Sequence, residues 1–160
     1  MSLSEEVSKR FPDVVSQTHQ KAGDETIIVR GGDGILALTR ALRDDPHFAF
    51  NYLIDLTAVD YLTMGVQPRF AVVYHLFSLE KNHRLRIKVP VEESNATLPS
   101  VTSIWPAANW FEREVWDMFG IHFSGHPNLK RILMYEEFKG HALRKDYPWN
   151  KRQPLIGPVN

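Results

Sequence analysis

The 160-residue chain contains no cysteine, and this absence excludes several kinds of chemistry at once. Without thiols the chain forms no disulfide, no cysteine-ligated iron–sulfur or zinc site and no thiol nucleophile. The sequence also has no apolar run near the roughly 20 residues that a membrane-spanning helix needs. Its first residues, MSLSEEVSKRF, are too acidic and polar for a signal peptide. We therefore expect a chain that holds no redox cofactor and does not itself enter the membrane.

An excess of charge is absent as well, because 19 Lys and Arg side chains balance 19 Asp and Glu. A neutral chain lacks the basic surface typical of nucleic-acid binding, so we expect no nucleic-acid partner. The charges are nevertheless unevenly distributed. Residues 125–160 carry seven basic and three acidic side chains, whereas residues 1–124 carry 12 and 16. This contrast indicates either a docking segment for another protein or a tail folded back on its own body.

The order of the predicted elements favours an α+β fold with a single domain of two layers. Apolar periodicity predicts helices over residues 2–11, 35–43 and 109–120, and strands over residues 14–19, 26–30, 52–61, 69–79 and 84–91. Runs of strands separated by helices indicate a mixed sheet of about five strands with the helices mainly on one face. In the third strand we expect Leu53, Asp55 and Thr57 to share a face. Asp60 is expected to cap the turn that follows.

Two parts are expected within the chain. Residues 1–124, which include the helix at 109–120, are predicted to form the α+β core domain. Residues 125–160 combine turn-forming residues with basic side chains, so we expect an extended, irregular docking arm and tail.

The helix at 109–120 carries the most informative pattern. Asn109 is a candidate N-cap, with Glu112 at the capping-box position three residues later, and Gly120 is expected to end the helix. Arg113 and Asp117 are spaced for an ion pair along one face.

Trp110 and Glu114 share that polar face. Aromatic side chains beside charges are typical of protein–protein interfaces, whereas the plainer interpretation is a solvated face of weak ion pairs. A stand-alone hydrolase that uses Glu114 and Asp117 as acid and base is a remote alternative. His122 and His126 lack a supporting metal-site motif, so no zinc site is expected.

The same stretch resembles one protein family. The run ERE-x-W-D-x-F-G-I-x-F-x-G-H-P-x-L-x-R-I-L, followed by G-H-x-L-R-K-D-Y-P, is similar to the signature of the C subunit of the proton-pumping NADH:quinone oxidoreductase, respiratory complex I. The mitochondrial counterpart is the thirty-kilodalton subunit. The earlier segments LIDLTAVDY and VVYHLFSL resemble the family too, so the similarity covers about residues 27–149. At one position the sequence departs from the family, which usually has proline where Ala142 stands.

The resemblance implies a non-catalytic structural subunit of the peripheral arm, which braces the quinone-reducing module. Its partners would be the other peripheral-arm subunits, especially those that form the quinone pocket and the terminal cluster. FMN and the iron–sulfur clusters would lie in those partners, and this chain would have no cofactor, metal ion or catalytic residue. The resemblance also implies a position at the cytoplasmic face of the bacterial inner membrane, with membrane contact only through the complex.

The signature residues are expected to lie at subunit interfaces. They are Trp110, Glu112, Arg113, Glu114, Asp117, His126, Pro127, Arg131, His141, Arg144, Lys145 and Asp146. The equivalent subunit of a plastid-type NAD(P)H:plastoquinone enzyme or of a membrane-bound hydrogenase remains an alternative, and so does a generic adaptor protein.

Overall fold

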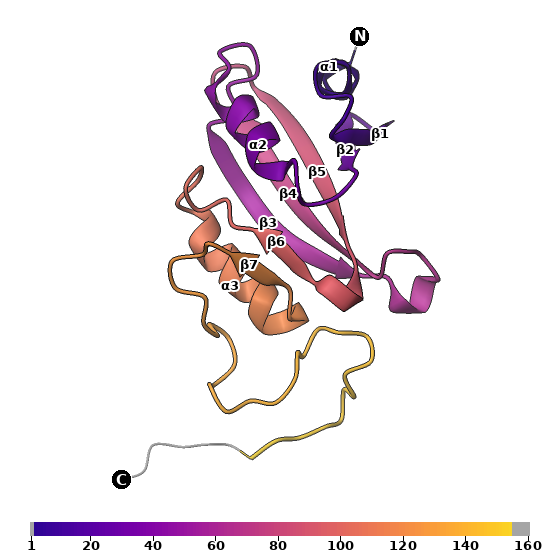
Figure 1. Ribbon diagram of the computed structural model, residues 1–160, viewed down its shortest axis with the longest axis vertical. Helices are drawn as coiled ribbons and strands as arrows, with labels where there is room; N and C mark the ends of the chain where they lie inside the picture. Colours follow the sequence, from indigo (N-terminus) through magenta and orange to yellow (C-terminus); the bar gives the residue numbers. More distant parts are fainter. Residues whose placement is uncertain (1, 155–160) are drawn as a thin grey trace.

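A five-stranded mixed sheet forms the centre of the computed structural model, which describes residues 2–154 (Figure 1). The strands are β1 (Val15–Lys21), β2 (Asp24–Val29), β3 (Tyr52–Asp60), β4 (Phe70–Ser78) and β5 (His83–Val91). They lie in the order β1-β2-β5-β4-β3, and the pair β2–β5 is parallel while the other three pairs are antiparallel. The predicted mixed sheet of about five strands is therefore confirmed.

Three helices cover the sheet mainly on one face, as predicted (Figure 1). They are α1 (Leu3–Arg10), α2 (Ile35–Asp44) and α3 (Ala108–Phe119). Alternation along the strands explains this arrangement, because Val72, Tyr74 and Leu76 of β4 point into the core and are fully buried. Burying an apolar side chain such as Val72 or Leu76 contributes about 1.5–3 kcal/mol, so the helices pack stably on this face.

The structure departs from the expected pattern in strand β3. A bulge shifts the register between Leu53 and Asp55, so that Leu56 and Ala58 face the core. The expected grouping of Leu53 with Asp55 and Thr57 on one face is therefore wrong, because a bulge reverses the alternation beyond it.

Two kinds of short element lie outside the sequence expectations. Two three-residue strands, β6 (Thr97–Pro99) and β7 (His122–Ser124), pair in parallel and form a separate small sheet. A 3-10 turn, η1 (Leu62–Met64), lies in the loop between β3 and β4, and a second, η2 (Glu93–Asn95), follows β5.

The segment after β7 winds across the end of the domain where α3 stops (Figure 1, orange to yellow). In its described part, residues 125–154, it forms neither a helix nor a strand. We call residues 125–154 the arm. None of the helices within residues 2–154 combines the length and hydrophobicity that a membrane-spanning helix requires.

Candidate docking site at the end of helix α3

Helix α3 begins differently from the sequence expectation. Its N-cap position is Ala107, whose side chain has no hydrogen-bonding group, so the predicted N-cap at Asn109 is wrong. The capping-box role of Glu112 is wrong for the same reason. The Glu112 side chain points into the protein, where its carboxylate accepts hydrogen bonds from Ser100 Oγ (2.6 Å) and the Val101 N–H (2.7 Å). Burial raises the pKa of Glu112 to about 7, although these two hydrogen bonds limit the rise.

Asp117 anchors the arm to the helix. Its side chain is fully buried, and its Oδ2 accepts hydrogen bonds from the N–H groups of Ile132 (3.1 Å), Leu133 (2.8 Å) and Met134 (2.9 Å). Its Oδ1 accepts from Arg131 Nη1 at 2.5 Å. Three consecutive N–H groups that converge on one oxygen form an anion cradle of backbone dipoles. Burial raises the pKa of Asp117, but the donors outweigh burial and bring the pKa below its usual range.

The predicted ion pair between Arg113 and Asp117 is wrong. In the part of the chain that the structure describes, Arg113 instead donates from Nε and Nη2 to the carbonyl oxygens of Lys130 (3.0 Å) and Arg131 (2.9 Å). The spacing of four residues does place both side chains toward the arm. Each side chain then bonds to the arm rather than to the other, because the backbone of the arm supplies acceptors to Arg113 and donors to Asp117.

The last turn of α3 is also closed by the arm. The carbonyl oxygens of residues 117–119 accept, in order, from His141 Nδ1 (3.0 Å), the Leu143 N–H (3.1 Å) and Arg144 Nε (2.6 Å). Carbonyl groups at a helix C-terminus lack intrahelical partners, and a cation there is favoured by the helix dipole. Gly120 ends the helix as predicted, with φ of 77°, and a Cβ there would lie 2.6 Å from His141 Nε2. Glycine thus permits both the left-handed turn and the close approach of the arm.

A second cluster ties the arm to the sheet through Arg69, whose side chain is buried. Arg69 Nη2 lies 2.8 Å from an oxygen of Asp60 and 2.8 Å from an oxygen of Asp146, and Nη1 lies 2.6 Å from Glu93. The Lys145 N–H donates to Asp60 Oδ2 at 2.9 Å. The end of β3, the residue that precedes β4, η2 and the arm therefore meet at one guanidinium group.

Asp60 performs the predicted turn-capping role and a larger one besides. Its Oδ1 accepts the Leu62 N–H at 2.9 Å, which confirms the turn cap. Burial raises its pKa, but the hydrogen bonds from Arg69 and from the two N–H groups bring the pKa down to about 2. Arg69 was not predicted from the sequence as the partner of Asp60. The pairing of Asp60 with Phe70 between β3 and β4 places Arg69, the residue before Phe70, next to Asp60.

The predicted interface residues fall into three groups by exposure. Glu112 and Asp117 are fully buried and make contacts inside the chain. The exposed residues are Trp110, Glu114, Pro127, Lys145 and Asp146, and the half-buried residues are Arg113, His126, Arg131, His141 and Arg144. The half-buried members hold the arm: His126, for example, bonds through Nε2 to the Asn109 carbonyl oxygen at 3.0 Å.

Large apolar side chains are exposed on the arm, and sequence analysis missed them. Leu133, Leu143 and Trp149 point outward, and Trp149 is 96% exposed, while Trp110 on α3 is 69% exposed. Exposed apolar surface is typical of a protein that docks on another protein. Their sequence signal was weak, because an apolar residue in an irregular segment has no periodicity that assigns it to a face.

The site does not have the geometry of an active site. Asp117 is buried under the arm, so it has no access to a substrate, and the acid–base pair with the exposed Glu114 is wrong. Within residues 2–154, no group of three or more His, Asp or Glu side chains is placed to hold a metal ion.

Comparison with known families gives a consistent result. Residues 30–153 match the family described as the 30 Kd subunit of respiratory-chain NADH dehydrogenase. The C subunit of the NADH-quinone oxidoreductase of Roseiflexus sp. strain RS-1 is 49% identical over 147 residues, which are 92% of this chain and 83% of that protein. The C subunit of the same enzyme from Citrifermentans bemidjiense is 46% identical over 156 residues, covering 96% and 94% of the two chains.

Solved structures show the same fold. A trypsin-resistant fragment of Nqo5 superposes with a TM-score of 0.63 at 34% identity, covering 78% of this chain and 95% of the fragment. A chain of an archaeal membrane-bound sulfane sulfur reductase gives a TM-score of 0.66 at 23% identity and covers 83% of this chain and 75% of that chain. This second likeness concerns the fold alone.

Proposed function

The chain belongs to the family of the 30 Kd subunit of respiratory-chain NADH dehydrogenase, and we propose that it is the C subunit of an NADH-quinone oxidoreductase. In this role it is a structural subunit of the peripheral arm of complex I. It braces the quinone-reducing module of an enzyme that passes electrons from NADH to quinone and translocates protons. The isolated chain is inactive and carries no step of the chemistry.

One observation supports a bracing role above all: the family-signature residues build the junction between α3 and the arm. Asp117, Arg131, His141 and Arg144 contribute their contacts to holding the arm in one path across the end of the helix. A rigid arm presents its exposed apolar side chains at fixed positions, which reduces the ordering cost of docking. The signature residues therefore fix the position of the arm and do not take part in a chemical step.

The division of the chain is part of this proposal. Residues 1–124 act as the folded core domain, and residues 125–160 act as the basic docking arm and tail. The similar Nqo5 structure is that of a trypsin-resistant fragment, residues 1–134, which supports a core domain that is resistant to proteolysis. The hydrogen bonds from the arm to Asp117 and Asp60 imply that the core folds more stably with the arm attached.

The interface assignment follows from exposure. Trp110, Glu114, Pro127 and Lys145 are free to contact a neighbouring subunit directly. The buried and half-buried signature residues contribute indirectly by fixing the arm. The partners are other peripheral-arm subunits, above all those that form the quinone pocket and the terminal cluster. The FMN and the iron–sulfur clusters lie in partner subunits and not in this chain. The chain then lies at the cytoplasmic face of the bacterial inner membrane as a peripheral component.

The alternatives within the superfamily have less support. The relatives at 46–49% identity are named as subunits of NADH-quinone oxidoreductase. The fold likeness to the sulfane sulfur reductase, at 23% identity, does not favour a different enzyme. No observation favours a plastid-type NAD(P)H:plastoquinone enzyme or a membrane-bound hydrogenase.

Affinity purification from native membranes tests the proposal. The tagged full-length chain is expected to co-purify with NADH:quinone reductase activity, with FMN and with iron–sulfur proteins, all identified by mass spectrometry and absorption spectra. A tagged chain that is recovered alone, or with a hydrogenase instead, would contradict it. The isolated chain serves as the matched control and is expected to show no flavin or cluster absorption.

A further inference from the structure

The open face of the sheet, opposite the helices, carries a groove. A hollow of about 540 Å³ lies between strands β2, β4 and β5 and the loop that holds η1. Ile28, Ala71 and Pro90 contribute to it from the strands, and Val66 and Pro68 from the loop. Side chains alternate along a strand, so these strand positions face away from the buried core on the helix side.

The groove is longer than one hollow. A second hollow of about 380 Å³ shares Arg30, Pro68 and Pro90 with the first and continues past residues 92–99. The combined lining therefore runs from residues 16–17 of β1 to residues 92–99 after β5, and we describe the two adjoining hollows as one elongated groove. An elongated groove suits an extended peptide, whose side chains can enter separate pockets, better than a compact ligand.

The first hollow is positively charged. Arg30 and Lys88 both line it, and neither takes part in an ion pair within residues 2–154. No carboxylate is found among its described lining residues. The second hollow differs, because Asp33 and Glu92 stand there beside Arg30. An occupant that matches these charges has a carboxylate in the first hollow and a neutral or basic side chain in the second.

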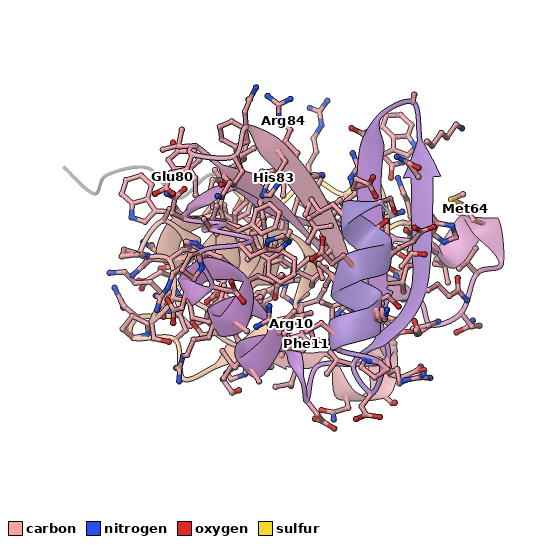
Figure 2. All side chains as sticks on the ribbon, turned by 90° about the horizontal axis from the view of Figure 1, so that it is seen from above. Arg10, Phe11, Met64, Glu80, His83 and Arg84 are labelled. Carbon is pink, nitrogen blue, oxygen red and sulfur yellow. The ribbon has the colours of Figure 1, made fainter. Side chains whose placement is uncertain are left out.

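The loop that contributes Val66 to the first hollow carries three exposed apolar side chains, Leu62, Met64 and Val66, which we call the apolar rim. They stand at alternate positions of the loop, and Met64 is 67% exposed. Figure 2 shows Met64 at the outer edge of the molecule. The loop is held in place, because the Leu62 N–H donates to Asp60 Oδ1 (2.9 Å) and the Tyr61 N–H donates to the Arg69 carbonyl oxygen (2.8 Å). Exposed apolar side chains outside the hollows give a protein partner further contact area that a small ligand would leave bare.

From these observations we propose that the groove binds an extended segment of a partner protein with an acidic side chain seated between Arg30 and Lys88. The inference rests on the proposed function only in taking the partner to be a neighbouring subunit. Elongation, unpaired cations and the apolar rim support a peptide, and charge complementarity sets its chemistry.

Photo-crosslinking in the assembled complex tests the groove. A photoreactive amino acid replaces Gln67, an exposed residue of the groove wall, in the full-length chain expressed in its native membranes. The control position is Lys81, which is exposed in the turn between β4 and β5, at the other end of the strands. We expect the Gln67 probe to crosslink a segment of another subunit with Asp or Glu close to the attachment point, and the Lys81 probe not to crosslink it.

A charge reversal supplies the second part of the test. Lys88→Glu is expected to lower the Gln67 crosslink by about tenfold or more, which corresponds to about 1.4 kcal/mol. Lys81→Glu makes the same change of charge outside the groove and is expected to leave the yield unchanged. The milder Lys88→Gln tests the charge if Lys88→Glu unfolds, and melting curves of both variants report folding.

The outcomes separate this inference from the proposed function. A Gln67 crosslink no stronger than that of Lys81, one to a second copy of this chain, or one to a segment without a carboxylate would overturn the inference. Insensitivity to both Lys88 variants would overturn it too. If the chain does not co-purify with NADH:quinone reductase, the proposed function fails, whereas a crosslink to an acidic segment of another protein would still support the groove.

Discussion

Replacing Asp117 with Asn removes one charge from the centre of the α3–arm junction at almost constant volume. In its better orientation the amide oxygen still accepts from the N–H groups of residues 132–134, but the amide nitrogen then faces the Arg131 guanidinium, donor against donor. Three charge-assisted hydrogen bonds become neutral, at about 1 kcal/mol each, and a buried ion pair is lost. The expected loss in the free energy of unfolding is about 3–5 kcal/mol.

Urea unfolding at pH 7 measures this loss, and limited trypsin digestion after Lys130, Arg131 and Lys139 reports whether the arm has come loose. The matched control is Glu114→Gln, which removes the same charge from an exposed position on the same helix and is expected to change stability by less than about 0.5 kcal/mol. The folded-state pKa of Asp117 is lowered, so its charge stabilises the fold above the unfolded pKa of 3.8. The difference in the free energy of unfolding between the wild type and Asp117→Asn should therefore become smaller as the pH falls below that value. Equal stability of the two proteins at pH 7 would refute this account of the junction.

Three further changes probe the same region. Folding raises the pKa of Glu112 from 4.5 to about 7, so the free energy of unfolding of the wild type should fall by about 3 kcal/mol as the pH rises through that window. Glu112→Gln should show no such fall, and urea unfolding at pH 5 and pH 8 compares the two proteins. Ala142→Pro should raise stability by about 0.4–1 kcal/mol, measured by thermal unfolding, because residue 142 follows His141 in a turn closed by the Arg144 N–H, where proline is favoured. Gly120→Ala should lower the free energy of unfolding by about 1–3 kcal/mol and speed trypsin cleavage of the arm, because alanine disfavours a φ of 77° and its Cβ would clash with His141. A wild-type digestion rate would contradict this contact.

The sheet and helices could be predicted because their apolar residues recur with a clear period. Strand β5 alternates regularly from Leu85 to Val91, and in β4 large apolar residues recur at every second position from Phe70 to Leu76, so the positions of both strands follow from sequence. Ala71 and Val73 on the other face of β4 are buried as well, and alternation alone does not predict this. The bulge in β3 was not predictable in the same way, because one extra residue leaves no mark on composition. Strands β6 and β7 have three residues each, which is too short for any periodicity.

The candidate site could be predicted only in part. The signature stretch stands out in the sequence, and Gly120 was placed correctly as the end of α3. The partners of its charged residues were not, since local spacing favoured Arg113 for Asp117 while the actual donors lie 14–17 residues further on. Partners of this kind depend on the path of an irregular segment, which no helical or strand period encodes. The apparent surface carboxylates Glu112 and Asp117 therefore lie inside the protein rather than on its surface.

The central claim is that this chain supports the enzyme by holding shape and performs no chemical step. The most direct test measures NADH:quinone turnover per assembled complex in membranes that carry Asp117→Asn, with Glu114→Gln as the control. The account predicts that Asp117→Asn lowers the amount of assembled complex while each assembled complex keeps the wild-type turnover. Normal assembly combined with a loss of turnover would contradict it, because Asp117 would then contribute to the reaction rather than to the structure.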